Sequence, residues 1–91
     1  MAPMAKVFFT QHLRDVAPRG EIATDGATVR AALNDVFAAY PMLKGYVLDD
    51  QERLRLHIAV FVDGAQVRRD VLDHPLQAGS ELYIMQALSG G

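Results

Sequence analysis

The feature that most constrains the fold of this chain is a single amphipathic helix pattern that lies between segments with strand patterns. Its apolar residues recur at i, i+4, i+7 and i+11, the spacing of one helical stripe; they are Val29, Leu33, Val36 and Tyr40. Thr28 can cap the first turn, and Pro41 ends the pattern. We therefore predict one main helix with one apolar face, which must pack against another layer.

Segments rich in β-branched and aromatic residues precede and follow this helix. They span residues 6–9, 21–24, 57–62, 65–67 and 81–85, and the second of them is the weakest. Asp63-Gly64 is a tight-turn signature between two of them. The segment 42–48 is apolar but contains Gly45, and we interpret it as a surface excursion that leads into an acidic turn at 49–52. Strands on both sides of one helix predict an α+β domain, with a mixed sheet packed on that helix.

The period of two along the strands divides their apolar residues between two sheet faces. We assign the aliphatic set to the core: Ile58, Val60, Val62, Leu82 and Ile84. The opposite face then carries Phe8, Phe61, Tyr83 and Met85. An uncovered apolar patch of this kind marks an interaction surface, so these residues are candidates for partner binding. The alternative is that loops cover them, or that a register shift of one residue exchanges the two faces.

Length, charge and cysteine content limit the classes of function that the protein can have. A chain of 91 residues with 51% hydrophobic residues predicts one globular domain over residues 1–91. The net charge is −2, and arginines gather only at Arg53/Arg55 and Arg68-Arg69, so a nucleic-acid partner is not expected. The absence of cysteine excludes disulfides and a sulfur carried on a protein thiol. The apolar start is too short for a signal peptide or a membrane span, so we expect a cytoplasmic protein without a membrane partner.

No constellation in the sequence predicts catalysis, a metal or a bound cofactor. His12, His57 and His74 lack the spacing of metal ligands, and the acidic turn lacks the pattern of a calcium loop. Neither Ser80 nor Ser89 lies in a nucleophile elbow. Most glycines are isolated, so no phosphate-binding loop is present. The domain is therefore not expected to be an enzyme by itself.

The sequence closes on Leu88-Ser89-Gly90-Gly91. Glycine has no Cβ, so a glycine pair can enter a narrow tunnel and present its carboxylate inside another protein's active site. That carboxylate is ionised at neutral pH and can act as a nucleophile. The alternative is a frayed end without a function. We expect residues 88–91 to form a flexible tail because they lie beyond the last strand pattern.

Several segments in order along the chain together resemble one known family. They are Gly26-Ala27-Thr28-Val29-Arg30-Ala31-Ala32-Leu33, Val60-Phe61-Val62-Asp63-Gly64, Leu72-Asp73-His74-Pro75-Leu76-Gln77-Ala78-Gly79-Ser80-Glu81-Leu82, and Gly90-Gly91. This order is similar to that of the MoaD/ThiS-type ubiquitin-like sulfur carriers, which have the β-grasp fold.

The resemblance implies a reaction at the end of the chain. In that family a ubiquitin-activating-like adenylyltransferase uses ATP to adenylate the terminal glycine, and a sulfur donor then forms a thiocarboxylate. The implied reactive residue here is Gly91, with Gly90, Ser89 and Leu88 as its tail. ATP belongs to the partner enzyme, and a sulfur-accepting biosynthetic enzyme is the second implied partner. The carrier itself would hold no cofactor.

The branch of the family stays open. Gln86-Ala87-Leu88-Ser89 stands where molybdopterin-type members have a proline-rich approach, whereas the segment 40–50 with Leu54-Arg55 is more similar to longer carriers of the CysO type. One alternative is the small subunit of a molybdopterin-synthase-like complex. Others are a protein modifier conjugated through Gly91 to lysines, and a ubiquitin-like interaction domain with an inert tail.

Overall fold

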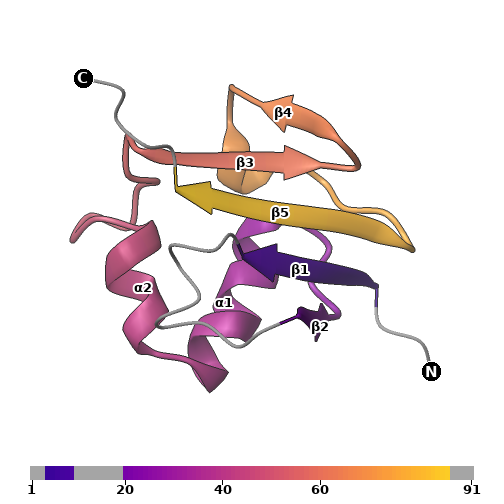
Figure 1. Ribbon diagram of the computed structural model, residues 1–91, viewed down its shortest axis with the longest axis horizontal. Helices are drawn as coiled ribbons and strands as arrows, with labels where there is room; N and C mark the ends of the chain where they lie inside the picture. Colours follow the sequence, from indigo (N-terminus) through magenta and orange to yellow (C-terminus); the bar gives the residue numbers. More distant parts are fainter. Residues whose placement is uncertain (1–3, 10–19, 87–91) are drawn as a thin grey trace.

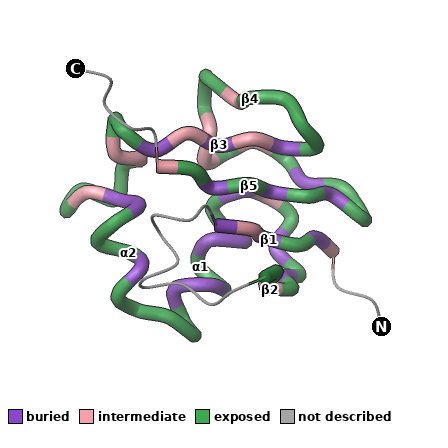
Figure 2. The backbone as a smooth tube through the Cα atoms, viewed as in Figure 1, coloured by how far each residue is buried: buried purple, intermediate pink, exposed green. Residues whose placement is uncertain are grey.

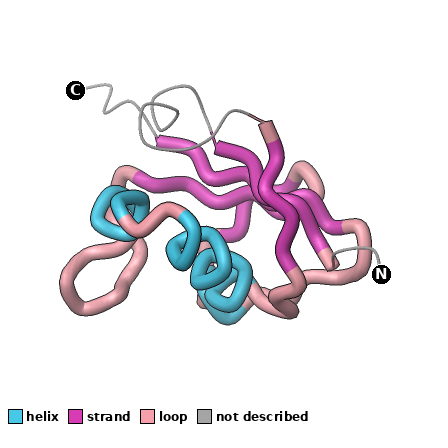
Figure 3. Tube along the Cα trace, turned by 90° about the horizontal axis from the view of Figure 1, so that it is seen from below, coloured by secondary structure: helices cyan, strands magenta, loops and turns pink. Residues whose placement is uncertain are grey.

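The computed structural model describes residues 4–9 and 20–86, which form a five-stranded sheet packed on helices (Figure 1). The elements in chain order are β1 (Ala5–Phe9), β2 (Glu21–Thr24), α1 (Val29–Ala39), α2 (Met42–Val47), β3 (Ile58–Val62), β4 (Ala65–Val67), the 3₁₀ turn η2 (Val71–Asp73) and β5 (Ser80–Gln86). The sheet order is β2-β1-β5-β3-β4. Both helices lie on the same side of the sheet (Figure 3). The predicted α+β class with a mixed sheet is confirmed.

The centre of the sheet is a parallel pair, β1 and β5, in a sheet whose other pairs are antiparallel. Parallel neighbours need a crossover connection, because the chain must return to the starting edge before the second strand begins. Here the connection contains β2, both helices, the β3–β4 hairpin and η2. The last strand is therefore central, with β1 on one side and β3 on the other.

Helix α1 begins and ends where the sequence predicts. The Thr28 hydroxyl accepts a hydrogen bond from the Ala31 backbone N–H at 3.2 Å, which satisfies an otherwise unpaired donor of the first turn. The apolar stripe differs from the prediction at its last member. Tyr40 is the C-cap residue, with non-helical φ and ψ of −132° and 74°, and its side chain is 37% exposed. Phe37, one turn earlier, is buried and takes its place in the core.

The interpretation of segment 42–48 as a surface excursion is wrong. It forms helix α2, and Leu43 and Val47 are completely buried because their i, i+4 spacing puts both on the face toward the core. Pro41 ends the first helix but adopts helical φ and ψ of −59° and −28°, so it also starts the second. Met42 and Tyr46 lie on the exposed side of α2.

The core lies between the helices and one face of the sheet. Burial alternates along β3 and β5, as the tube in Figure 2 shows, and the residues predicted for the core are the buried ones. Val60, Leu82 and Ile84 are at most 1% exposed. The predicted assignment of the β3 and β5 residues to the two faces of the sheet is therefore confirmed.

Among the described glycines, only Gly26, between β2 and α1, has no room for an added Cβ. Gly26 is buried, and its N–H donates to the Thr24 hydroxyl at 3.0 Å while that hydroxyl donates to the Asp35 carboxylate at 2.6 Å. A Cβ on Gly26 would lie 2.6 Å from the carbonyl carbon of Ala31 and still closer to the backbone nitrogen of Ala32. Only glycine fits here without moving the first turn of α1.

We predict that Gly26→Ala destabilises the domain by about 1–3 kcal/mol, because the added methyl group overpacks against backbone atoms that cannot rotate away. Gly45→Ala is the matched control, since Gly45 lies in α2 with no atom within 4 Å of the new methyl group. That change should stabilise the protein by about 0.5–1 kcal/mol through helix propensity. Urea unfolding followed by circular dichroism measures both. Equal stability of the two variants would contradict the packing described for Gly26.

Candidate functional site at the open sheet face

The sheet face away from the helices carries a row of aromatic rings. Strand register places Tyr83 of β5 opposite both Phe8 of β1 and Phe61 of β3, so three neighbouring strands contribute one ring each. The rings of Phe8 and Tyr83 are stacked, with centroids 4.6 Å apart and planes inclined by 12°. Offset stacking of this kind favours one fixed arrangement of the two rings.

The exposure of the residues on this face agrees with the predicted division of the apolar residues between the two sheet faces. Tyr83 and Met85 are 37% and 38% exposed, and Phe8 and Phe61 are half-buried. We call these residues, Phe8, Phe61, Tyr83 and Met85, the open face. Its lateral limits are polar, because Glu21 lies opposite Phe8 on the edge strand β2 and Gln66 opposite Phe61 on the edge strand β4. The structure brings the predicted partner-binding residues together, and their role in binding stays a prediction.

The side chains around the open face are charged on the β1–β2 side. Lys6 lies on the same face of β1 as Phe8, and its ammonium group lies 3.1 Å from the Glu21 carboxylate. Both side chains are about half exposed, so the ion pair contributes little to stability. The arrangement is an apolar strip with a polar margin, which is the usual composition of a protein-binding surface.

Strand β5 leads from the open face directly toward the end of the chain. Met85 lies opposite Ala59, and Gln86, the last described residue, lies opposite Ile58 at the start of β3. The predicted reactive tail lies outside the described residues; it consists of Leu88, Ser89, Gly90 and Gly91. The residues from 87 to 91 can extend for at most about 18 Å. Any partner that contacts residue 91 must therefore lie near the surface around Gln86.

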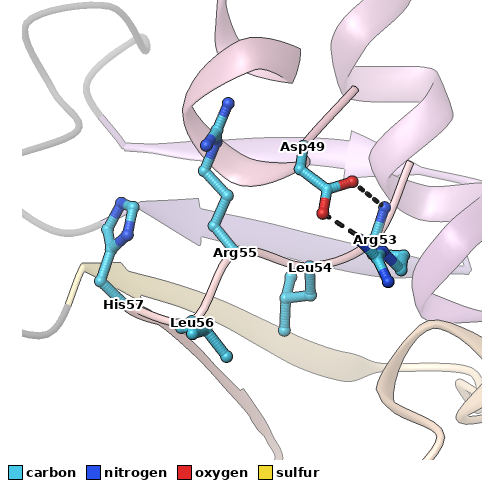
Figure 4. Close-up of a pocket in the computed structure, with 6 residues that line it drawn as sticks. All are labelled: Asp49, Arg53, Leu54, Arg55, Leu56 and His57. Carbon is cyan, nitrogen blue, oxygen red and sulfur yellow. Dashed lines mark hydrogen bonds and ion pairs between the residues drawn. The ribbon is translucent and has the colours of Figure 1, made fainter. Parts of the chain in front are cut away.

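The loop between α2 and β3 is beside this end of the sheet and is held by Asp49. One oxygen of its carboxylate accepts the backbone N–H groups of Gln51 and Arg53, each at 2.9 Å, and the other lies 3.3 Å from the Arg53 Nε. The Arg53 backbone N–H lowers the pKa of Asp49 most of all; desolvation, the second-largest effect, opposes it, and the Gln51 N–H and the Arg53 guanidinium lower the pKa further. A hollow of about 530 Å³ lies along the loop (Figure 4).

The remaining sequence candidates lie apart from the open face. His57 is exposed at the end of the loop, and the His74 carbonyl accepts the Val29 N–H at 3.0 Å beside the start of α1, while His12 lies outside the described residues. Within residues 4–9 and 20–86, no three histidine or acidic side chains are arranged to hold a metal ion. In the same ranges no helix is long and apolar enough to cross a membrane.

Sequence reasoning missed the position of Leu56. This residue is fully exposed, at 104%, and it lies two positions before β3, the strand that pairs with the end of β5. An apolar residue between Arg55 and His57 is the only signal in the sequence, and it is weak because isolated exposed leucines are common. Only the long-range pairing of Ile58 with Gln86 brings this part of the chain to the end of β5.

The chain is similar to known proteins over its whole length. The model of the ThiS family matches residues 7–91. SAMP1 from Haloferax volcanii is 31% identical with a TM-score of 0.79, over 96% of this chain and 98% of that one. The small archaeal modifier protein 1 of Methanosarcina acetivorans is 26% identical with a TM-score of 0.83, over 100% and 99%. These likenesses confirm the predicted β-grasp fold.

A third likeness is to a protein seen with a partner. A chain of the BexX/CysO complex from Amycolatopsis orientalis is 28% identical with a TM-score of 0.82, over 96% of this chain and 99% of that one. A comparison with curated proteins found no match. The family match and the structural likenesses thus agree on one fold and one class of protein.

We predict that the Asp49 carboxyl titrates below the usual range of an aspartate, as NMR of its side-chain carbon will show. Because the folded-state pKa is lowered, the stability that Asp49 gives the loop is fully present above its unfolded-state pKa. It is lost as the pH falls through the lowered folded-state pKa. Arg53→Gln should raise the pKa only in part, since the backbone donors remain. Titration of Asp49 in the ordinary range would contradict its hydrogen bonds to Arg53, which Figure 4 shows, and to the Gln51 N–H.

Proposed function

Because the chain belongs to the ThiS family of ubiquitin-like sulfur carriers, we propose that Gly91 is adenylated by a ubiquitin-activating-like enzyme and converted to a thiocarboxylate that donates sulfur in biosynthesis. Proteins of this family act as substrates of enzymes and are not enzymes themselves. The observation that carries the proposal is the course of β5, which runs along the open face and ends at Gln86, a few residues before Gly90-Gly91.

The proposed reaction has two steps. An oxygen of the Gly91 carboxylate attacks the α-phosphate of ATP, a new bond forms between that oxygen and phosphorus, and pyrophosphate leaves. Hydrosulfide, delivered by a sulfur donor, then attacks the activated carbonyl carbon, and AMP leaves with its bonding electron pair. The product is the thiocarboxylate of Gly91. ATP is bound by the partner enzyme, and the carrier supplies only the carboxylate.

The composition of the chain supports this placement of the sulfur. No cysteine is present, so no side-chain thiol can carry the transferred atom. Glycine at positions 90 and 91 lets a tail pass through a channel that any side chain would obstruct. We propose that the reaction takes place in the cytoplasm, on a single domain of residues 1–91 whose tail is residues 88–91.

We assign the open face to the activating enzyme. Tyr83 and Met85 belong to β5, the strand that precedes the tail in sequence, so an enzyme that receives the tail lies close to them. Partly exposed aromatic side chains with a polar margin are the side chains that dominate the energy of protein interfaces. The partnership of the CysO relative with BexX supports a second, sulfur-accepting partner for this chain.

A protein modifier is the second candidate function, because two similar structures are of proteins named small archaeal modifier protein 1. The two functions share the adenylate and differ in the nucleophile that follows. Hydrosulfide gives a thiocarboxylate, whereas a lysine amine gives an isopeptide bond and releases AMP in the same way. The acceptor pathway, whether for cysteine, molybdopterin or another product, is not resolved by the family match.

We predict that the protein gains the mass of one oxygen-to-sulfur exchange when it is incubated with a cognate activating enzyme, ATP and sulfide. Intact mass measurement, followed by fragmentation, should place the gain on the peptide that ends at Gly91. Deletion of Gly91, or addition of one residue after it, should abolish the gain without changing the circular dichroism spectrum. Gly90→Ala should fold normally and react poorly. Sulfur on an internal residue, or transfer that survives the deletion, would refute the proposal.

A second prediction concerns the open face. Tyr83→Ser and Phe61→Ser should each weaken binding to the activating enzyme by about 2 kcal/mol or more, because they remove aromatic anchors from an interface. Met42→Ser is the matched control, since Met42 is 71% exposed on α2, on the other side of the sheet. Isothermal titration calorimetry measures affinity, and thermal unfolding measures stability. Variants that unfold easily but bind normally when folded would show that these rings serve the core alone.

A further inference from the structure

The side-chain amines of this chain are few. The sequence contains no cysteine and only two lysines, Lys6 and Lys44, and both lie in the described part of the chain. Thiols and amines are the side chains that react most readily with an activated carboxyl group. Arginine does not compete with them, because its guanidinium stays charged. An activated Gly91 can therefore meet only two reactive side chains of its own chain.

Lys6 lies far from the end of β5. In the parallel pair of β1 and β5 it lies opposite Glu81, five residues before Gln86, which is about 16 Å along the strand. Its ammonium group lies 3.1 Å from the Glu21 carboxylate at the margin of the open face. Because we assign the open face to the activating enzyme, Lys6 is covered while Gly91 is being activated.

Lys44 is joined to the end of β5 by a short series of backbone contacts. It lies less than one helical turn before Val47, whose carbonyl accepts the Arg55 N–H at 3.0 Å. The Arg55 carbonyl accepts the Ile58 N–H at 3.0 Å, and Ile58 lies opposite Gln86. Each of these four steps spans about 5–7 Å between Cα atoms, so the Cα atoms of Lys44 and Gln86 are at most about 24 Å apart. Figure 1 shows the end of α2 next to the end of β5.

The length of the tail matches this separation. The residues from 87 to 91 extend for at most about 18 Å, and an extended lysine side chain adds about 6 Å. The carbonyl carbon of Gly91 can therefore reach the Lys44 amine of the same chain. The link closes a loop through described residues, and the domain does not need to unfold.

The surroundings of Lys44 leave room for a chain end. Its side chain is 49% exposed, and its ammonium group lies 3.0 Å from the Glu52 carboxylate. An ion pair between exposed groups is weak, so it does not keep Lys44 from another partner. The hollow beside Lys44 has a volume of about 640 Å³, and its lining includes Gly45, Asp49, Asp50 and Glu52. A tail that ends in two glycines needs little of this space.

We infer that Lys44 is an internal acceptor for the activated carboxyl group of Gly91. An adenylate that leaves the activating enzyme before a sulfur donor reaches it is captured by Lys44, and an isopeptide bond joins the two residues. This inference rests on the proposed function, because adenylation of Gly91 is its first step. Capture withdraws the carrier from sulfur transfer, since the carboxyl group is then an amide.

The capture step is an ordinary aminolysis. The Lys44 nitrogen attacks the carbonyl carbon of Gly91, a C–N bond forms, and the bond between that carbon and the phosphate oxygen breaks. AMP leaves with the bonding electron pair, and the nitrogen passes its proton to the Glu52 carboxylate and then to water. Hydrosulfide competes for the same carbonyl carbon. The thiocarboxylate that it forms is an anion and a poor acyl donor, so it is not captured.

Capture within one chain is favoured over attack by a second molecule. A short connecting segment gives the tied group an effective concentration of about 1 mM, which is well above the concentration of a protein in the micromolar range. The product is therefore a monomer, and its mass is one water below that of the free acid.

The test uses the full chain with Gly91 converted to the thioester of a small thiol, an acyl donor that needs no enzyme. At about pH 8.5 more of a lysine amine is uncharged than at neutral pH, and the wild type should form the dehydrated monomer. Fragmentation should find the Lys44 peptide joined to the peptide that ends at Gly91. Lys44→Arg keeps the charge beside Glu52 and should reduce this product about tenfold or more. Lys6→Arg is the matched control and should leave the yield unchanged.

A second arm uses the cognate activating enzyme with ATP. Without sulfide the wild type should accumulate the same linked monomer, and sulfide should replace it with the thiocarboxylate. Hydrolysis alone in the thioester arm, covalent dimers, or a link that persists in Lys44→Arg would overturn the inference. If the enzyme still makes the thiocarboxylate, the proposed function then stands. No ATP-dependent reaction at Gly91 would refute the proposed function and the inference with it, since no adenylate would exist.

Discussion

The parallel pairing of β1 with β5 is the interaction on which the rest of this structure depends. It places the last strand at the centre of the sheet, where Leu82 and Ile84 are completely buried. A central strand is held by hydrogen bonds on both sides, so its direction and register are fixed by two neighbours. The residues that follow Gln86 are thus attached to the most constrained strand of the domain. The proposed reactive residue, Gly91, therefore follows a strand whose place in the sheet is fixed.

The same pairing explains why one face of the sheet is left open. The crossover between the parallel strands puts α1 and α2 on one side, and the described chain has no second layer for the other side. The aromatic row of Phe8, Tyr83 and Phe61 occupies that side. Phe8 and Phe61 are half-buried and the Tyr83 ring stacks on Phe8, which limits the cost of exposing these rings to water in the free protein. The open face, which we propose as the binding surface, and the central place of β5 therefore have one structural origin.

Local patterns in the sequence predicted most of this fold because they record which side of each element faces the core. The Thr28 cap, the alternation in β3 and β5, and the Asp63-Gly64 turn all appear in the structure as expected. The prediction that Tyr40 belongs to the apolar stripe was wrong, because its backbone leaves the helix at the C-cap. Phe37, one turn earlier, fills the core instead. Helix α2 was missed because Gly45 lowers helix propensity, whereas tertiary burial of Leu43 and Val47 outweighs that cost.

The candidate site was only partly predictable, since its parts come together through long-range register. The open-face residues follow from alternation along each strand, but the approach of the loop between α2 and β3 to the end of β5 depends on the β3–β5 pairing, which no local pattern contains. The central claim, that Gly91 carries sulfur, is tested most directly on the protein purified from its own cells. The account predicts that mass spectrometry of the C-terminal peptide finds a fraction ending at Gly91 as a thiocarboxylate. A peptide that continues past Gly91, or one that ends there and never carries sulfur even when the cells are limited for sulfur acceptors, would contradict it.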